Sequence, residues 1–131
     1  MLDAATCAAI LRRSDAADKA VFDRLTGQSV GEVCISAVTL AELMHGAEVS
    51  RRSAQERAAI DVFLRHVAVL DFPRGAAEHY GMVKMVLGLC ELSATAEEMF
   101  AAAHARSLGI TLVSRNARDL ARTPDLSAES W

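Results

Sequence analysis

Short apolar runs alternate along the chain with longer segments in which apolar positions recur at helical spacing. The apolar runs have the lengths of buried strands, and they cover residues 1–3, 31–36, 67–72 and 110–113. A last run, at residues 126–131, is expected to form a terminal tail or an edge strand. Because strands that alternate with helices predict a parallel sheet covered on both faces, we expect an α/β fold.

The segments between these runs carry signals for helix ends. Asp15 is a suitable N-cap, Gly109 is a suitable C′ residue, and capping boxes begin at Ser53 and Thr95. Pro73 is expected to end the strand at residues 67–72. Helices are therefore expected at residues 4–13, 17–25, from 36 or 39 onward, from 53 onward, 76–91 and 95–108, with a helical turn at 117–121.

Length and composition predict one soluble domain over residues 1–131, long enough to bury a core without disulfides or a structural metal. Apolar residues make up 52% of the chain, and the mean hydropathy is +0.20. Two interpretations fit this value. Either an apolar surface is covered by another subunit, or the many alanines form the core and raise the hydropathy without forming patches.

The charge distribution limits what the chain can bind. The net charge of −3 excludes a protein that coats nucleic acid through its overall charge, so any such contact has to be local. Arginines gather in three groups, which are either solvated helix faces or a rim that meets phosphates. The groups are Arg12 and Arg13; Arg51, Arg52 and Arg57; and Arg115, Arg118 and Arg122.

Cysteines and apolar stretches indicate the compartment. Cys7, Cys34 and Cys90 are odd in number and form no zinc pattern, so they are expected to be reduced core residues. The first residues do not show the charged start and apolar core typical of a secretion signal, and no apolar run approaches the roughly 18 residues that a membrane helix needs. We expect a cytoplasmic protein.

Four polar side chains interrupt surroundings that are otherwise apolar or small: Asp3, Glu42, Glu98 and Asn116. A carboxylate is costly to bury alone, so acids that enter an apolar interior from distant positions favour a shared cation. Asp3 and Asn116 each follow a predicted strand, and sites in parallel sheets form beyond the carboxyl ends of the strands. Oxygen ligands without histidine or cysteine favour Mg²⁺ or Mn²⁺ over zinc.

Each of these four residues also has a purely structural explanation. Asp3 and Asn116 can cap the helical segments that follow them, and Glu98 can complete the capping box of Thr95. Glu42 lies opposite the apolar stripe of its helix, although that helix is small or apolar nearly all round. The residues alone leave both explanations open. No phosphate-binding loop, dinucleotide fingerprint or nucleophile elbow is present.

Several segments, in a fixed order, carry a likeness to a known family. They are Met-Leu-Asp3, Ile35-Ser-Ala-Val-Thr-Leu-Ala-Glu-Leu-Met-His-Gly-Ala-Glu48, Ala101-Ala-Ala-His-Ala105, Leu112-Val-Ser-Arg-Asn116, Arg118-Asp-Leu120 and the final Trp131. Through them, essentially the whole chain resembles the VapC-type PIN-domain ribonuclease toxins of bacterial type II toxin–antitoxin operons. The segment over residues 35–48 is the most specific match.

The resemblance implies a PIN-like domain with a short parallel sheet and an endoribonuclease activity that depends on Mg²⁺ or Mn²⁺. By position, Asp3, Glu42 and Glu98 are the implied metal ligands, and Asn116 occupies the fourth site, where family members carry Asp or Asn. The implied partners are an RNA substrate, an antitoxin that lies across an apolar groove near the site, and a second copy of the chain.

Three departures from the family pattern predict a weakened site. Ala4 and Ala5 replace the family's Thr and Asn after the first acid, Glu98 replaces an Asp, and Ser93-Ala-Thr95 replaces a Pro-x-Gly approach. A displaced carboxylate matters because Mg²⁺ demands near-ideal octahedral geometry. The alternative is therefore a catalytically inactive PIN-fold protein that binds an antitoxin or RNA without cleaving it. A third hypothesis is a metal-dependent nuclease that acts on DNA.

Overall fold

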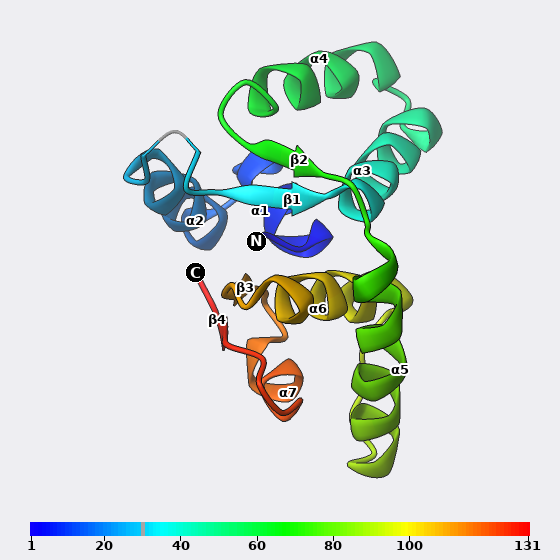
Figure 1. Cartoon of the computed structure of the whole chain (residues 1–131). Helices are drawn as coiled ribbons and strands as arrows, with labels where there is room; N and C mark the ends of the chain where they lie inside the picture. Colours follow the sequence, from blue (N-terminus) through cyan, green and yellow to red (C-terminus); the bar gives the residue numbers. More distant parts are fainter. Residues whose placement is uncertain (30) are drawn as a thin grey trace.

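The computed structural model describes residues 1–29 and 31–131, which fold around one parallel sheet (Figure 1). In this sheet β1 (Cys34–Ser36) pairs with β2 (Ala68–Leu70), and β3 (Leu112–Val113) pairs with β4 (Ala128–Glu129). Leu2 bridges Ile35 on one side and Val113 on the other, both in parallel. The single residue Leu2 thus joins the two pairs, and the order across the sheet is β2, β1, Leu2, β3, β4.

Helices fill the connections between the strands, as the periodicity predicts. They are α1 (Ala4–Arg12), α2 (Ala16–Thr26), α3 (Ala37–Val49), α4 (Ser53–Phe63), α5 (Arg74–Leu89), α6 (Ala96–Leu108) and α7 (Ala117–Leu120). Asp15 caps α2 by accepting a hydrogen bond from the Asp18 amide. Gly109 ends α6 in the left-handed conformation, with φ of 64°, which suits a residue without a Cβ atom. These local signals therefore predicted the ends of both helices.

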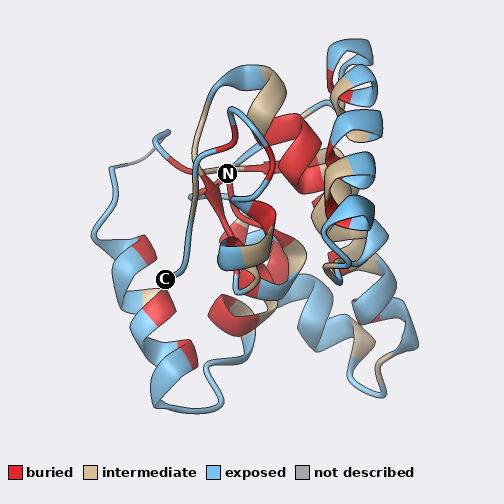
Figure 2. Ribbon diagram, turned by 90° about the horizontal axis from the view of Figure 1, so that it is seen from below, coloured by how far each residue is buried: buried red, intermediate tan, exposed pale blue. Residues whose placement is uncertain are grey.

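Two apolar cores lie on opposite faces of the sheet, because successive strand residues point to opposite sides. Leu2 and Val113 face a core formed with α1, α2, α3 and α4. Their neighbours Met1 and Leu112 face a second core formed with α5, α6 and α7. Figure 2 shows the buried residues gathered on the strands and on the inner sides of the helices. The predicted fold, a short parallel sheet covered by helices on both faces, is confirmed.

The prediction that residues 67–72 form a buried strand is wrong in its burial. Val67 is buried, but Ala68 and Val69 in β2 are exposed. The reason is the position of β2, which pairs only with β1 and forms one border of the sheet. An apolar run alone does not distinguish a central strand from a border strand.

The capping box predicted at Ser53 is also wrong. Ser53 is the first residue of α4 rather than its cap, and Arg52 in the cap position makes no side-chain hydrogen bond to the helix. The Glu56 carboxylate instead accepts a hydrogen bond from the Ser50 hydroxyl, which also accepts one from the Arg52 amide at 3.1 Å. The turn before α4 therefore uses Ser50 to organise the helix start.

The three cysteines are free, but their burial differs from the prediction. Cys7 is buried and Cys34 is half-buried, whereas Cys90 is exposed because it caps the carboxyl end of α5 at the surface. Within the described ranges, none of the helices has the length and apolar character needed to cross a membrane.

Candidate active site

Asp3 is a buried acid at the junction between the sheet and α1. Its side chain is 1% exposed, and its Oδ1 atom caps α1 by accepting the Thr6 amide at 2.7 Å. The Asp3 amide and the Thr6 hydroxyl both donate to the carbonyl of Val113, at 3.1 and 3.3 Å. Asp3 is therefore fixed against the carboxyl end of β3.

The second oxygen of Asp3, Oδ2, is buried and has no hydrogen-bond partner within the part of the chain that the structure describes. A buried carboxylate oxygen without a partner is unfavourable unless a cation or another donor approaches it. The capping explanation accounts for Oδ1 alone. Oδ2 is thus the atom of this region whose chemistry best fits a metal ligand.

Glu98 and Asn116 contact each other across the gap between α6 and α7. Glu98 closes the predicted capping box, since its Oε2 atom accepts the Thr95 amide at 2.8 Å while its own amide donates to the Thr95 hydroxyl at 3.2 Å. The side-chain amide of Asn116 donates to the same Oε2 at 3.5 Å and to the Ser93 carbonyl at 3.0 Å. Glu98 therefore serves as a cap and also faces the fourth candidate residue.

Glu42 is half-buried on α3, which begins directly after β1. This helix packs against both α1, which follows Asp3, and α6, which contains Glu98. The chain enters α3, α1 and α7 from parallel strand positions, so Glu42, Asp3 and Asn116 all lie toward the carboxyl end of the sheet. Direct contact is observed for Glu98 with Asn116, whereas Glu42 has no ion pair or hydrogen bond with the other three residues in the described ranges.

The donor set suits a hard divalent cation, because it consists of carboxylate and amide oxygens. The arrangement is not an assembled metal centre. Among residues 1–29 and 31–131, no three Asp, Glu, His or Cys side chains lie close enough together to hold an ion. The residues therefore fit Mg²⁺ or Mn²⁺ in their chemistry, and the carboxylates of Glu42 and Glu98 would have to reorient toward Asp3.

Sequence reasoning missed a second buried acid, Asp18, in the first turn of α2. Its side chain is 2% exposed and accepts hydrogen bonds from the Ser14 hydroxyl at 2.7 Å and from the Ser14 amide at 3.3 Å. Its other oxygen binds the guanidinium of Arg115, the residue next to Asn116. The local signal was an acid three residues after the cap Asp15, close behind two arginines.

Electrostatics keep Asp18 charged and Cys7 neutral. The Ser14 hydroxyl, helped by the Arg115 guanidinium, lowers the pKa of Asp18 despite its burial. Burial, and then the negative charge of Asp3, raise the pKa of the Cys7 thiol. Cys7 is therefore a neutral packing residue beneath Asp3, and a thiolate nucleophile at this position is disfavoured.

The fold and the site together define a class: small α/β domains that carry acidic side chains on the segments that follow the strands of a short parallel sheet. The model of the PIN domain family matches residues 1–126. The chain belongs to the PIN-domain family, and the resemblance to VapC-type toxins that the sequence indicated is confirmed by its relatives.

Among these relatives, ribonuclease VapC2 of Haemophilus influenzae is 38% identical over 104 residues, which are 79% of each chain. The tRNA(fMet)-specific endonuclease VapC of Shigella flexneri is 33% identical over 131 residues, which are 100% of this chain and 96% of the relative. The crystal structure of DNA-bound VapBC from Salmonella typhimurium matches with a TM-score of 0.83 and 30% identity, covering 100% of this chain and 96% of the other.

Proposed function

We propose that this chain is an endoribonuclease that depends on Mg²⁺ or Mn²⁺ and acts as the toxin of a VapBC-type toxin–antitoxin pair. Relatives that match it over most or all of its length are ribonucleases or endonucleases by name. The observation that carries the proposal is the buried, unpartnered Oδ2 atom of Asp3, within the described residues, at the sheet end that also carries Asn116. In this proposal the protein acts on RNA in the cytoplasm.

In this proposal Asp3, Glu42 and Glu98 hold the ion, as the family resemblance implies. A bound divalent ion orients water, lowers the pKa of that water and stabilises charge on a phosphodiester. Asp3 is the fixed ligand, because its backbone is bonded to β3 and its Oδ1 to α1. Glu42 completes the ligand sphere or accepts a proton, and the Asn116 amide positions Glu98 through their shared hydrogen bond.

The activity is weakened in this proposal, because Glu98 is held by its cap. The Thr95 amide binds Oε2 of Glu98 at 2.8 Å, so moving the carboxylate toward Asp3 gives up a bond that stabilises the start of α6. Ala4 and Ala5 offer no hydroxyl or amide group to support Asp3, although the nearby Thr6 hydroxyl bonds to the same carbonyl as the Asp3 amide.

The test is RNA cleavage under titration with Mn²⁺ or Mg²⁺. We expect the wild type to cut structured RNA only when the metal is present, and an Asp3→Asn, Glu98→Gln double variant to lose this activity. Asp61→Asn, which removes one negative charge from an exposed position on α4, is the control and should cut at the wild-type rate. Undiminished cleavage by the double variant would falsify the assignment of the site.

The same observations define the alternative, a PIN-fold protein that binds without cleaving. It is favoured by the engagement of Glu98 in its capping box and by the lack of an assembled trio of ligands in the described residues. If the wild type leaves RNA intact at every metal concentration and still binds an antitoxin, this alternative replaces the enzyme.

We propose that the antitoxin binds an apolar groove between α1, α2 and α4. The lining includes Val33 and His66, which precede β1 and β2, so this groove lies toward the amino ends of the strands and not beside the acidic residues, where the family resemblance implies it. The groove has a volume of about 620 Å³, and its lining includes polar residues such as Arg13 and His66. Its apolar lining includes Ile10, Leu11, Phe22, Leu25, Val62 and Phe63. A groove of this kind suits the apolar side of a helix or an extended segment of a partner.

Placing a charge in this groove should release the antitoxin. Val62 lines the groove and is 54% exposed, so Val62→Asp is expected to preserve the fold and to weaken binding at least tenfold by leaving the aspartate buried against the partner. The binding partner to use is the product of the neighbouring reading frame, measured by calorimetry. Val49→Asp, at a position that is 71% exposed and outside the groove, is the matched control. Equal affinity of the two variants would remove the groove from the proposal.

We also propose a homodimer, supported by an apolar stripe on α5. Met82, Met85 and Leu89 are spaced three and four residues apart and are 39%, 51% and 77% exposed. An uncovered stripe of this kind is typical of a surface that another subunit covers. Light scattering on the free chain should give twice its mass of 14.0 kDa, and the mass of a single chain would contradict the dimer.

A further inference from the structure

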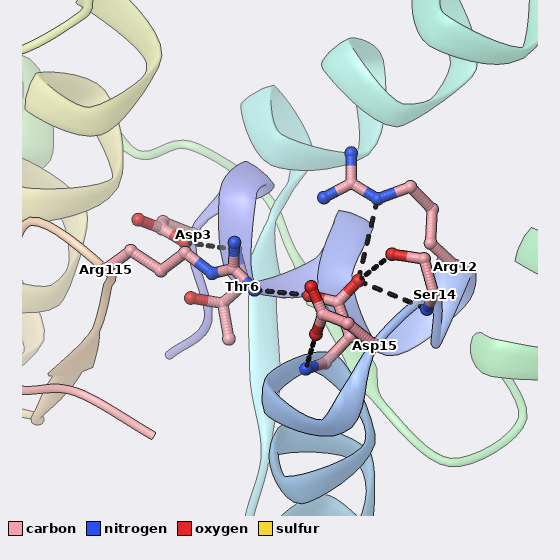
Figure 3. A network of polar contacts seen from close by, with 7 residues as sticks. Asp3, Thr6, Arg12, Ser14, Asp15 and Arg115 are labelled. Atoms are coloured by element: carbon pink, nitrogen blue, oxygen red, sulfur yellow. Dashed lines mark hydrogen bonds and ion pairs between the residues drawn. The ribbon is translucent and has the colours of Figure 1, made fainter.

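The ion pair between Asp18 and Arg115 joins two segments of the chain that are 97 positions apart. Asp18 lies in the corner between α1 and α2, where the Ser14 hydroxyl and amide and, at 3.9 Å, the Arg12 guanidinium also approach its carboxylate. Figure 3 shows Arg115 extending toward this corner, which carries Arg12, Ser14 and Asp15. Arg115 itself belongs to the turn between β3 and α7.

Stability alone is a poor explanation for this pair. Removing a carboxylate from water offsets most of what its attraction to a cation gains, so buried ion pairs contribute little to folding compared with apolar side chains of the same size. The α2 helix is already capped by Asp15. What the pair does achieve is geometric: it fixes the direction of the Arg115 side chain relative to the sheet.

Arg115 is fixed at the proposed site. The Val113 carbonyl, two residues before it, accepts hydrogen bonds from the Asp3 amide and the Thr6 hydroxyl. Asn116, the residue after it, contacts Glu98. Arg115 thus stands in the chain between the segment that holds Asp3 and the residue that touches Glu98.

Most N–H donors of the Arg115 side chain have no hydrogen-bond partner among residues 1–29 and 31–131. Asp18 binds only Nη2, and the side chain is 46% exposed. A guanidinium has five N–H donors in a planar fork that matches the oxygens of a phosphate. The Arg115 guanidinium is held by Asp18 through one nitrogen, and its other N–H groups are therefore available to bind an anion from solvent.

Carboxylates on both sides of Arg115, those of Asp3 and Glu98, in a chain of net charge −3 repel the phosphates of a substrate, so a fixed cation between them has a specific use. We propose that Arg115 binds a backbone phosphate of the RNA next to the acidic site, and that Asp18 is the positioning residue that holds Arg115 in place. This inference rests on the proposed ribonuclease function, and it names the residue of that site that contacts the substrate.

Binding of a fluorescent single-stranded RNA, measured in EDTA so that no cleavage occurs, tests the phosphate contact directly. Each phosphate contact contributes about 0.7 to the slope of log affinity against log salt for a single strand. We expect Arg115→Gln to lower this slope by about 0.7 and Arg115→Lys to preserve it. The control is Arg65→Gln, since Arg65 is exposed and precedes β2 by three residues, at the opposite end of the sheet.

The positioning role of Asp18 is tested by metal-dependent cleavage. Asp18→Asn keeps the charge of Arg115 but loosens its anchor, so we expect an unchanged salt slope and KM together with a kcat lowered about tenfold or more by misplacement of the phosphate. Arg115→Gln should raise KM. Circular dichroism and melting curves identify any variant that fails to fold. If Arg115→Gln does not fold, the Asp18→Asn, Arg115→Gln double variant replaces it, because the double variant leaves neither charge unpaired. It should show the same decrease of about 0.7 in the salt slope of RNA binding.

The outcomes separate this inference from the proposed function. If Arg115→Gln, or the double variant where that one is unfolded, shows the same salt slope as Arg65→Gln, the phosphate contact is overturned, even when the wild type cleaves RNA. An unchanged kcat in Asp18→Asn overturns the positioning role. If the wild type does not cleave, the ribonuclease proposal fails, and a lowered slope in Arg115→Gln would still establish the phosphate contact.

Discussion

Replacing Leu2 by alanine is expected to lower the free energy of unfolding by about 2 to 5 kcal/mol, the range for truncating a leucine in a tight core. Leu2 is fully buried, and it forms the bridge to β1 on one side and to β3 on the other. The truncated side chain therefore leaves a cavity in the core between the sheet and helices α1 to α4, which the strands cannot close without breaking their pairing. Urea denaturation followed by circular dichroism measures the loss.

The control is Val49→Ala on α3. The Val49 side chain is 71% exposed and lies outside the stripe proposed for the dimer, so its truncation should change the free energy of unfolding by no more than about 0.5 kcal/mol. A Leu2→Ala variant as stable as this control would mean that the Leu2 side chain does not support the core on its face of the sheet.

Replacing Glu98 by aspartate is expected to raise the rate of metal-dependent RNA cleavage by up to about a hundredfold. A side chain shorter by one methylene moves the carboxylate by about an ångström, and misplacement on that scale changes rates by about this factor. It also loses the reach to the Thr95 amide, which in the present structure holds Oε2 of Glu98 at 2.8 Å. The carboxylate is then free to face Asp3.

Two measurements separate this effect from a general change in the protein. The Mn²⁺ affinity, measured by calorimetry, should rise together with the rate, and the melting temperature should fall slightly because the capping box is lost. Glu98→Gln is the control, since it keeps the length of the side chain but removes the charge, and it should be less active than the wild type. A rate for Glu98→Asp at or below that of the wild type would contradict the idea that the longer acid weakens the site.

Much of the fold follows from local sequence patterns. Asp15, Thr95 and Gly109 each occupy the helix-end position that their side chains favour, and the structure confirms all three. The border position of β2 was not predictable in the same way. Its exposure depends on which strands pair with it, and that pairing is decided by contacts between distant segments rather than by the apolar run itself.

The candidate site likewise has features that the sequence predicts and features that it does not. The positions of Asp3 and Asn116 beyond strand ends were visible in the sequence, because parallel strands bring their carboxyl ends to one side. The pairing of Asp18 with Arg115 was not, since two charged residues in separate turns, 97 positions apart, leave no local pattern that connects them. The contact of Glu98 with Asn116, in addition to its role as a cap, was also not predictable, because the two residues are 18 positions apart in separate elements.

The central place of Leu2 in the sheet has a consequence for folding during synthesis on the ribosome. Val113, one of the two partners of Leu2, is translated 111 residues after Leu2. Until Val113 emerges, Leu2 can pair with β1 alone, and the carbonyl that binds the Asp3 amide is missing.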